Sequence, residues 1–147
     1  MKKVMLVGPV GAGKTSLIHA LQKDPKRVEK TQSIRFCDGA IDTPGEYAQI
    51  PRFYSALMVT AMEASVVVIV QDATDLKINL PPGFAMMFSR PVIGVVTKID
   101  VPGIDRDKVK SRLLQIGVKE PIFFISSHTG EGLDDLVEYF AEGRCKE

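Results

Sequence analysis

The sequence predicts a three-layer α/β fold, in which helices cover both faces of a mostly parallel sheet that has one antiparallel edge strand. Two observations support this prediction. Four short apolar runs suit strands that are buried on both faces, and segments of helical periodicity separate these runs. Such alternation is typical of a parallel sheet with right-handed crossovers. The 147 residues have room for one domain, so a single domain over residues 1–147 is expected.

The expected strands are continuous stretches of β-branched, aromatic and aliphatic residues. They cover residues 4–7, 66–70, 92–96 and 122–125. Between and after these runs, apolar side chains recur at the spacing of one helix face. The expected helices therefore lie around residues 17–21, 54–61, 109–116 and 133–140.

Two segments depart from simple alternation. Residues 33–36 and 40–42 flank Cys37-Asp38-Gly39, and Asp-Gly favours a tight hairpin, so this segment predicts the antiparallel edge strand. The stretch from Asp72 to Arg90 is interrupted by prolines, which argues against a long crossover helix there.

Composition argues against several classes of protein. The formal net charge is +1, and no basic stripe stands out, so neither a nucleic acid nor a membrane is an expected partner. Cys37 and Cys145 lie far apart and outside metal-ligand spacing, which favours free thiols. The first residues contain too few apolar side chains for a signal sequence or a membrane span, so a cytoplasmic protein is expected.

The strongest motif is Gly8-Pro9-Val10-Gly11-Ala12-Gly13-Lys14-Thr15, which satisfies G-x-x-x-x-G-K-[ST] between an expected strand and an expected helix. In such a loop, backbone N–H groups and the start of the helix surround phosphate groups. Lys14 is predicted to reach the β- and γ-phosphates, and Thr15 to offer its hydroxyl to Mg²⁺. The candidate phosphate-binding residues are Gly8, Val10, Gly11, Ala12, Gly13, Lys14, Thr15 and Ser16.

A second motif, Asp42-Thr43-Pro44-Gly45, matches the D-x-x-G pattern that partners this loop in GTPase-like proteins. Asp42 is predicted to hold Mg²⁺ through water, and Gly45 to present its N–H to the γ-phosphate. Taken by itself, the same pattern also fits a plain loop glycine after a helix-capping aspartate.

A third motif, Thr97-Lys98-Ile99-Asp100, resembles the N/T-K-x-D base-recognition segment of GTPases. The Asp100 carboxylate can accept hydrogen bonds from the N1 and exocyclic amino groups of guanine, an arrangement that adenine does not offer, while the Lys98 stem packs along the base. A charged turn at the end of a strand is the alternative. GTP or GDP is thus the expected ligand, with ATP as the alternative.

A fourth segment, Ser126-Ser127-His128, matches loosely the loop that supports the base through backbone groups. Its alternative is an ordinary loop that leads into the last helix. Both histidines of the chain, His19 and His128, are expected to be surface residues rather than catalytic bases.

With these four segments in order, the chain resembles the Ras-like P-loop GTPase superfamily over nearly its whole length. Lys30-Thr31-Gln32, followed by Ile41-Asp42-Thr43-Pro44-Gly45-Glu46-Tyr47, is similar to the ethanolamine- and propanediol-utilisation accessory P-loop family (EutP/PduV-like). The resemblance implies a P-loop NTPase fold and a role beside bacterial microcompartments, with shell proteins as partners. It also maps Thr31 onto the switch threonine that binds Mg²⁺.

Two departures from Ras-type enzymes predict slow turnover. Glu46 stands where those enzymes have a water-orienting glutamine, and Val10 stands where they have glycine. Lys14 and Glu46 are the candidate catalytic residues, with a solvated charge as the alternative role for Glu46.

Three functions remain open on the sequence. The first is a slow GTPase-like switch. The second is a phosphotransferase that uses ATP and a small carboxylate such as acetate, an activity proposed within the resembling family. The third is a nucleotide-dependent adaptor at the microcompartment shell that hydrolyses little.

Overall fold

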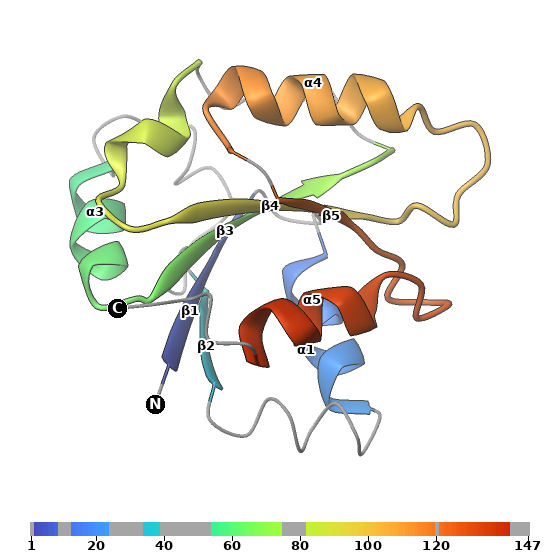
Figure 1. Cartoon of the computed structure of the whole chain (residues 1–147), viewed down its shortest axis with the longest axis horizontal. Coiled ribbons are helices and arrows are strands. Elements are labelled where there is room, and N and C mark those ends of the chain that lie inside the picture. Colours follow the sequence, from blue (N-terminus) through green and yellow to red (C-terminus); the bar gives the residue numbers. More distant parts are fainter. Residues whose placement is uncertain are drawn as a thin grey trace.

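The computed structural model describes residues 2–8, 13–23, 34–38, 54–74, 82–119 and 121–141. A parallel sheet forms the centre of this part of the chain (Figure 1). Its five strands have the order β2-β1-β3-β4-β5, and all four neighbouring pairs are parallel. The strands are β1 (Lys2–Val7), β2 (Ile34–Asp38), β3 (Val66–Asp72), β4 (Val92–Thr97) and β5 (Ile122–Phe124).

The predicted antiparallel edge strand is wrong. β2 forms the edge of the sheet, but it pairs with β1 in parallel, from Lys2 opposite Ile34 to Leu6 opposite Asp38. The connection from β1 passes through a helix, and such a crossover returns the chain in its original direction. Asp38, expected to start a hairpin, is instead the last residue of the strand. Residues 40–42, the other half of that hairpin, lie outside the described residues.

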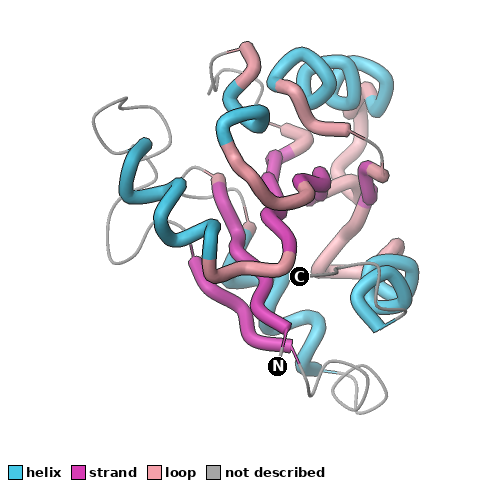
Figure 2. The backbone as a smooth tube through the Cα atoms, turned by 60° about the vertical axis from the view of Figure 1, so that its left-hand side comes forward, coloured by secondary structure: helices cyan, strands magenta, loops and turns pink. Residues whose placement is uncertain are grey.

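Helices cover both faces of the sheet, as predicted, and the tube in Figure 2 shows the strands between them. They are α1 (Lys14–Lys23), α3 (Tyr54–Met62), the short 3-10 helix η3 (Phe84–Met87), α4 (Arg106–Ile116) and α5 (Leu133–Ala141). In the described residues of the proline-interrupted stretch, 72–74 and 82–90, the one helical element is the four-residue η3, and residues 75–81 lie outside the described part of the chain.

Alternate residues of the strands supply two separate hydrophobic clusters. Val4 and Leu6 of β1 pack with α1 and α5, whereas Met5 and Val7 pack with α3, η3 and α4. β3 contributes to both clusters, and all seven of its residues are buried. This burial on both faces explains why the strand sequences are continuously apolar rather than alternating.

α4 is delimited by clear capping contacts. The Asp105 side chain accepts a hydrogen bond from the Lys108 N–H at 3.1 Å, which fixes the start of the helix. Gly117 ends it in the left-handed conformation, with φ of 107°, and its N–H bonds to the carbonyls of Leu113 and Leu114. These two caps fix the residues at which α4 begins and ends.

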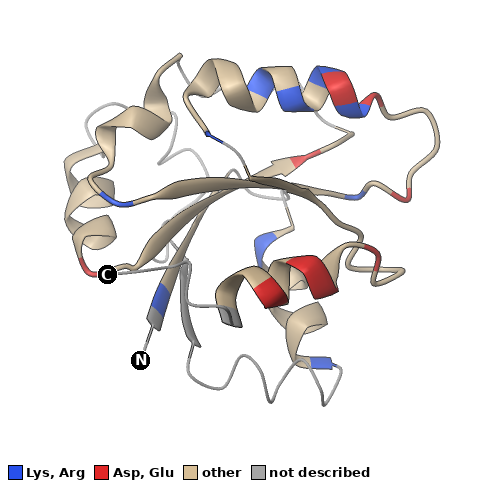
Figure 3. Cartoon of the chain, in the orientation of Figure 1, with Lys and Arg blue, Asp and Glu red and all other residues tan. Residues whose placement is uncertain are grey.

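Charge separates by helix despite the balanced composition, as Figure 3 shows. α4 carries four basic residues and one acidic residue, whereas α5 carries three acidic residues and no basic one, and the two helices lie on opposite faces of the sheet. The residues are Arg106, Lys108, Lys110 and Arg112 on α4, and Asp134, Asp135 and Glu138 on α5. Within the described ranges, none of the helices has the length and apolar character needed to cross a bilayer.

Candidate functional site

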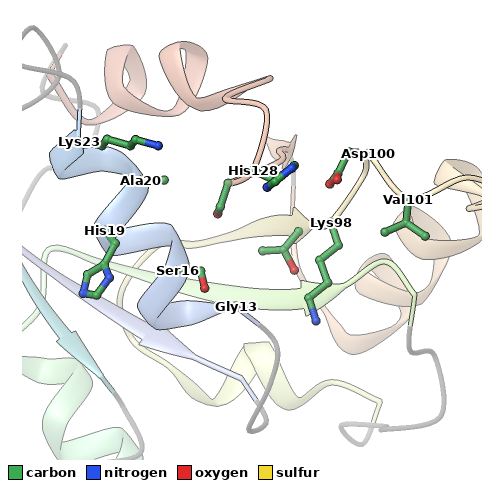
Figure 4. A pocket seen from close by; sticks show the side chains of 11 residues that line it. Gly13, Ser16, His19, Ala20, Lys23, Lys98, Asp100, Val101 and His128 are labelled. Atoms are coloured by element: carbon green, nitrogen blue, oxygen red, sulfur yellow. The ribbon is translucent and has the colours of Figure 1, made fainter.

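A cavity of about 610 Å³ opens at the carboxyl ends of the strands, between α1 and the loops that follow β4 and β5 (Figure 4). In open parallel sheets this is the edge where ligands bind. The lining residues come from three separate parts of the sequence. They are Gly13, Ser16, His19, Ala20, Lys23, Thr97, Lys98, Asp100, Val101, Ser127 and His128.

One end of the cavity lies at the start of α1. Lys14 is 9% exposed, and its ammonium group donates a hydrogen bond to the carbonyl of Gly8. Gly13 has φ of 102°, and a Cβ atom there would lie 3.3 Å from Cγ2 of Thr97, so both conformation and contact favour glycine. The first turn of α1 thus starts against the end of β4.

The other end of the site centres on Asp100. The hydroxyl of Ser126 donates to Oδ1 of Asp100 at 2.8 Å and accepts a hydrogen bond from the Thr129 N–H at 3.1 Å. Ser126 is fully buried. Because an ionised carboxylate can accept about four hydrogen bonds, this contact orients Asp100 and leaves capacity for further donors.

Backbone hydrogen bonds hold together the two ends of the loop that carries Ser126. The Ser126 N–H bonds to the Glu131 carbonyl at 3.0 Å, and the Gly130 N–H bonds to the Ser126 carbonyl at 2.8 Å. Gly132 has φ of 78°, and a Cβ atom there would lie 2.1 Å from the carbonyl oxygen of Phe124. Only glycine fits at this position, so it determines the path by which the loop returns to α5.

Lys98 lines the cavity between these two ends, and its side chain forms an ion pair with Asp72. Its backbone is left-handed, with φ of 63°, and its Nζ lies 2.7 Å from Oδ2 of Asp72. The N–H and hydroxyl of Thr74 both donate to the same carboxylate. Burial raises the pKa of Asp72, but hydrogen bonds from Lys98 and Thr74 outweigh it and hold the pKa below its ordinary value of 3.8.

Thr97, which replaces the commoner asparagine of the motif, is also buried. Its hydroxyl donates to the carbonyl of Gln71 at 3.3 Å, and its methyl group faces Gly13. Thr97 thus contacts both Gly13, at the start of α1, and the carboxyl end of β3.

The structure brings together many of the predicted site residues. Gly13, Ser16, Thr97, Lys98, Asp100 and Ser127 line the cavity, and Ser126 contacts Asp100. Lys14 and Thr15 lie in the first turn of α1 directly after Gly13, and Lys14 bonds to the Gly8 carbonyl. Other predicted residues lie outside the described part of the chain and stay predictions. They are Val10, Gly11, Ala12, Thr31, Asp42, Gly45 and Glu46.

Among the described residues, Thr15 is the one predicted ligand of Mg²⁺. This residue lies in the first turn of α1, is exposed, and directly follows the buried Lys14. A single hydroxyl in the first turn of α1 fits Mg²⁺, because this ion takes few protein ligands when it shares phosphate oxygens and water. The described residues contain no cluster of three or more histidine, cysteine, aspartate or glutamate side chains that could hold a metal without a phosphate.

Several lining residues were not predicted as part of the site. His19 and Lys23 follow Ser16 at helical spacing along α1, and His128 directly follows the Ser126-Ser127 pair. Figure 4 shows the Lys23 side chain directed across the cavity toward the loop of His128. The signal available in the sequence was the polar face of the helix after the glycine loop. For Asp72 the sequence offered no such signal, because strands buried on both faces lack the alternation that sets register.

A glycine loop between the first strand and a helix, a parallel sheet of this order, and a site at its carboxyl edge define a three-layer P-loop NTPase fold of the Ras-like type. Comparison with known proteins narrows this class. The chain belongs to the PduV-EutP family, described as ethanolamine utilisation – propanediol utilisation, whose model matches residues 1–142.

Relatives within this family are similar over most of their length. The chain is 41% identical over 143 residues to the "Probable acetate kinase EutP" of Escherichia coli strain K12, covering 96% of this chain and 90% of the relative. It is 39% identical over 137 residues to the "Propanediol utilization protein PduV" of Citrobacter freundii, covering 92% and 91%.

Solved structures support the fold. The G domain of the T. maritima FeoB iron transporter has a TM-score of 0.62 and 26% identity, with coverage of 97% of this chain and 98% of that one. A variant of S. thermophilus NFeoB bound to GDP and AlF4⁻ has a TM-score of 0.65 and 25% identity. The match covers 97% of this chain and 64% of that larger one.

Proposed function

We propose that this protein is a guanine-nucleotide-binding, slow GTPase-like accessory protein of ethanolamine or propanediol utilisation. The observation that carries the proposal is the Asp100 carboxylate, oriented by the buried Ser126 hydroxyl at 2.8 Å beside a cavity whose far end begins at Gly13. An oriented carboxylate suits the paired N–H donors of guanine. The GDP in the NFeoB structure supports the same ligand class.

The phosphate groups belong at the opposite end of the cavity. Lys14 would exchange its contact with the Gly8 carbonyl for phosphate oxygens, and the N–H groups of the loop and of α1 would surround them. Gly8, Val10, Gly11, Ala12, Gly13 and Ser16 are the remaining proposed contacts.

The proposed magnesium ligands are Thr15, Thr31 and Asp42. When bound, Mg²⁺ supplies positive charge that offsets the charge of the phosphate oxygens. Gly45 is the proposed sensor of the γ-phosphate, through its backbone N–H.

Turnover is proposed to be slow. Catalysis would depend on Lys14 and on positioning, because Glu46 replaces the glutamine that orients water in Ras-type enzymes and Val10 replaces their glycine. Glu46 keeps the role of a candidate for water orientation.

Base specificity is the decisive test. Titration of the purified protein with GTP, GDP and ATP should show tighter binding of the guanine nucleotides. Asp100→Ala should weaken GDP binding about 10- to 100-fold, because hydrogen bonds to charged groups are worth roughly 1.5–3 kcal/mol. Asp135→Ala, an exposed carboxylate on α5, is the matched control and should bind like the original chain. Tighter binding of ATP, unchanged in Asp100→Ala, contradicts the guanine assignment.

A second candidate is an ATP-dependent phosphotransferase that acts on acetate, and it is favoured by the name of the 41% identical relative, "Probable acetate kinase EutP". Such an enzyme needs a site for the carboxylate acceptor beside the γ-phosphate. Among the described residues, the cavity is lined by two lysines but no arginine. Incubation with ATP and acetate, followed by trapping of acetyl phosphate with hydroxylamine, tests this candidate, and the lack of product from pH 6 to pH 9 rejects it.

The third candidate is a nucleotide-dependent adaptor in the cytoplasm at the microcompartment shell. The family description supports the pathway, and the exposed apolar residues Met58, Val59 and Met62 on α3 supply a surface that follows the proposed switch segment in sequence. Pull-down of purified shell proteins should then differ between the GTP- and GDP-loaded forms. Equal recovery in both forms argues against a switch.

A further inference from the structure

Asp72 occupies a buried position directly beneath the proposed base-recognition segment. It is the last residue of β3, opposite Thr97 in the register of the neighbouring strand β4, and only 8% of its surface is exposed. Its Oδ2 atom lies 2.7 Å from Nζ of Lys98. The last residue of β3 therefore contacts Lys98, the residue that directly follows β4.

The Asp72 carboxylate is itself fixed in place. The Thr74 N–H donates to Oδ1 at 2.8 Å, and the Thr74 hydroxyl donates to the same atom at 2.6 Å. With the Lys98 contact, three hydrogen bonds fill most of what a carboxylate can accept. Its lowered pKa keeps Asp72 ionised at neutral pH, so the ion pair persists where solvent screening is reduced.

Lys98 also has a backbone conformation that needs support. A φ of 63° is disfavoured for a residue with a Cβ atom and persists only where neighbouring contacts impose it. The flanking contacts are present: the Ala73 N–H bonds to the Thr97 carbonyl at 3.0 Å, and the Ile99 N–H bonds to the Ile125 carbonyl at 3.3 Å. The side chain of Lys98 nevertheless remains 44% exposed along the cavity, and Asp72 is its charged anchor.

We propose that Asp72 is a positioning residue for nucleotide affinity: by holding the Lys98 ammonium, it orders the lysine stem along the wall against which the base packs. The inference rests on the proposed nucleotide-binding function and adds a residue that lies outside the recognition motif. A lysine side chain has many rotamers, and ordering it before the ligand arrives lowers the entropy cost of binding.

The test is a double-mutant cycle on the full chain, with dissociation constants and dissociation rates measured for fluorescent GDP and GTP analogues. Asp72→Asn keeps the shape of the side chain and removes its charge. We expect it to weaken both nucleotides about tenfold, mostly through faster dissociation, since affinity changes at one site fall mainly on that rate. In a Lys98→Ala background the same change should have less than about a twofold effect, because residues acting through one contact are not additive.

Thr74→Val is the second variant and keeps the proposal testable without altering either charged residue. It removes the hydroxyl that holds Oδ1 of Asp72, and Thr74 is exposed enough to accept the substitution. We expect a weakening of about two- to threefold, in keeping with the loss of one supporting hydrogen bond. Asp105→Ala, which removes the side-chain oxygen that caps α4 and should cost about 1 kcal/mol of stability, is the control for loss of stability alone and should leave affinity unchanged.

The outcomes separate the two proposals. If the original chain binds neither GDP nor GTP, both the proposed function and the role of Asp72 are rejected. If the original chain binds nucleotide and Asp72→Asn binds equally well, or if the Asp72 and Lys98 substitutions are additive, only the role of Asp72 is rejected.

Discussion

At the residue scale, polar side chains that are buried behind the cavity orient those that line it. Ser126 supports Asp100, Asp72 supports Lys98, and Thr97 connects Gly13 with the carbonyl of Gln71. Each supporting residue is almost completely removed from solvent. Hydrogen bonds at such positions restrict the geometry of the exposed partner, and their loss leaves a buried polar group without compensation.

Ser126→Ala tests this support directly. The substitution leaves the Thr129 N–H and Oδ1 of Asp100 without the hydroxyl, so we expect the free energy of unfolding to fall by about 1–3 kcal/mol. GDP affinity should fall several-fold, while the preference for guanine over adenine remains. Urea unfolding and GDP titration measure the two effects. Ser111→Ala on the exposed side of α4 serves as the control, and an equal loss in both variants contradicts the supporting role.

The pH dependence of stability should report Asp72. Because its pKa in the folded protein lies below the ordinary value of 3.8, the ionised form favours folding at every pH above that value. This contribution is lost as the pH falls through the pKa of the folded state. The difference in unfolding free energy between the original chain and Asp72→Asn should therefore be constant from pH 7 to about pH 5 and shrink below about pH 4. A difference that grows on acidification contradicts the assignment.

At the element scale, the path of the connection from β5 to α5 is set by Gly132. Gly132 combines φ of 78° with a carbonyl oxygen where its Cβ atom would have to lie, and Ser126 is held at the other end of the same loop. The position of the loop that carries Ser126 therefore depends on one glycine that is not part of any recognition motif.

Gly132→Ala should be severely destabilising. We expect a loss of at least about 2 kcal/mol in unfolding free energy, because overpacking and a left-handed backbone both oppose the new methyl group. Gly103→Ala provides a matched control: φ there is 84°, but nothing lies within 4 Å of the added atom, so only the conformational cost of about 1 kcal/mol applies. Chemical denaturation of both variants makes the comparison, and equal losses refute the steric account.

Sequence reasoning at this scale succeeded where the signal is local. Four strands and the helices after them follow from apolar runs and helical periodicity. The direction of β2 does not, because the Asp38-Gly39 pair favours a turn locally while pairing with β1 through a helical crossover decides the outcome. Asp72 was also not predicted as a residue of the site. Strands buried on both faces lack the alternation that sets register, so nothing in either strand indicates that Asp72 pairs with Thr97.

At the scale of the whole molecule, the order of the strands gathers the candidate site. β1 and β4 flank β3, and their carboxyl ends bring Gly13 and residues 97–100 to one edge. This gathering could be predicted from the alternation of strands and helices alone. The contribution of His19, Lys23 and His128 could not, because it depends on how α1 packs beside the loop before α5, which no motif in the sequence describes.

Nucleotide binding should stabilise the whole chain. A ligand at 100 times its dissociation constant adds about 2.7 kcal/mol to the unfolding free energy, and for a chain of this length that corresponds to a rise in Tm of roughly 5–10 °C. GDP should produce this rise and ADP should not. Thermal unfolding monitored by circular dichroism makes the measurement, with Asp100→Ala as the control that loses the response. Equal shifts with GDP and ADP would show that the base is not read.

The central place of β3 has a consequence for how the site opens. β3 is buried throughout and has a partner strand on each side, whereas β5 is a three-residue strand with β4 as its only neighbour in the described sheet. In hydrogen–deuterium exchange, the amides of β3 and β4 should be the slowest, and those of β5 and residues 125–130 should exchange through local opening. Lys98, which directly follows β4, should therefore stay with the slowly exchanging strands, whereas Ser126, which lies after β5, should open with that edge strand. The release of a bound base would then begin on the side of the edge strand.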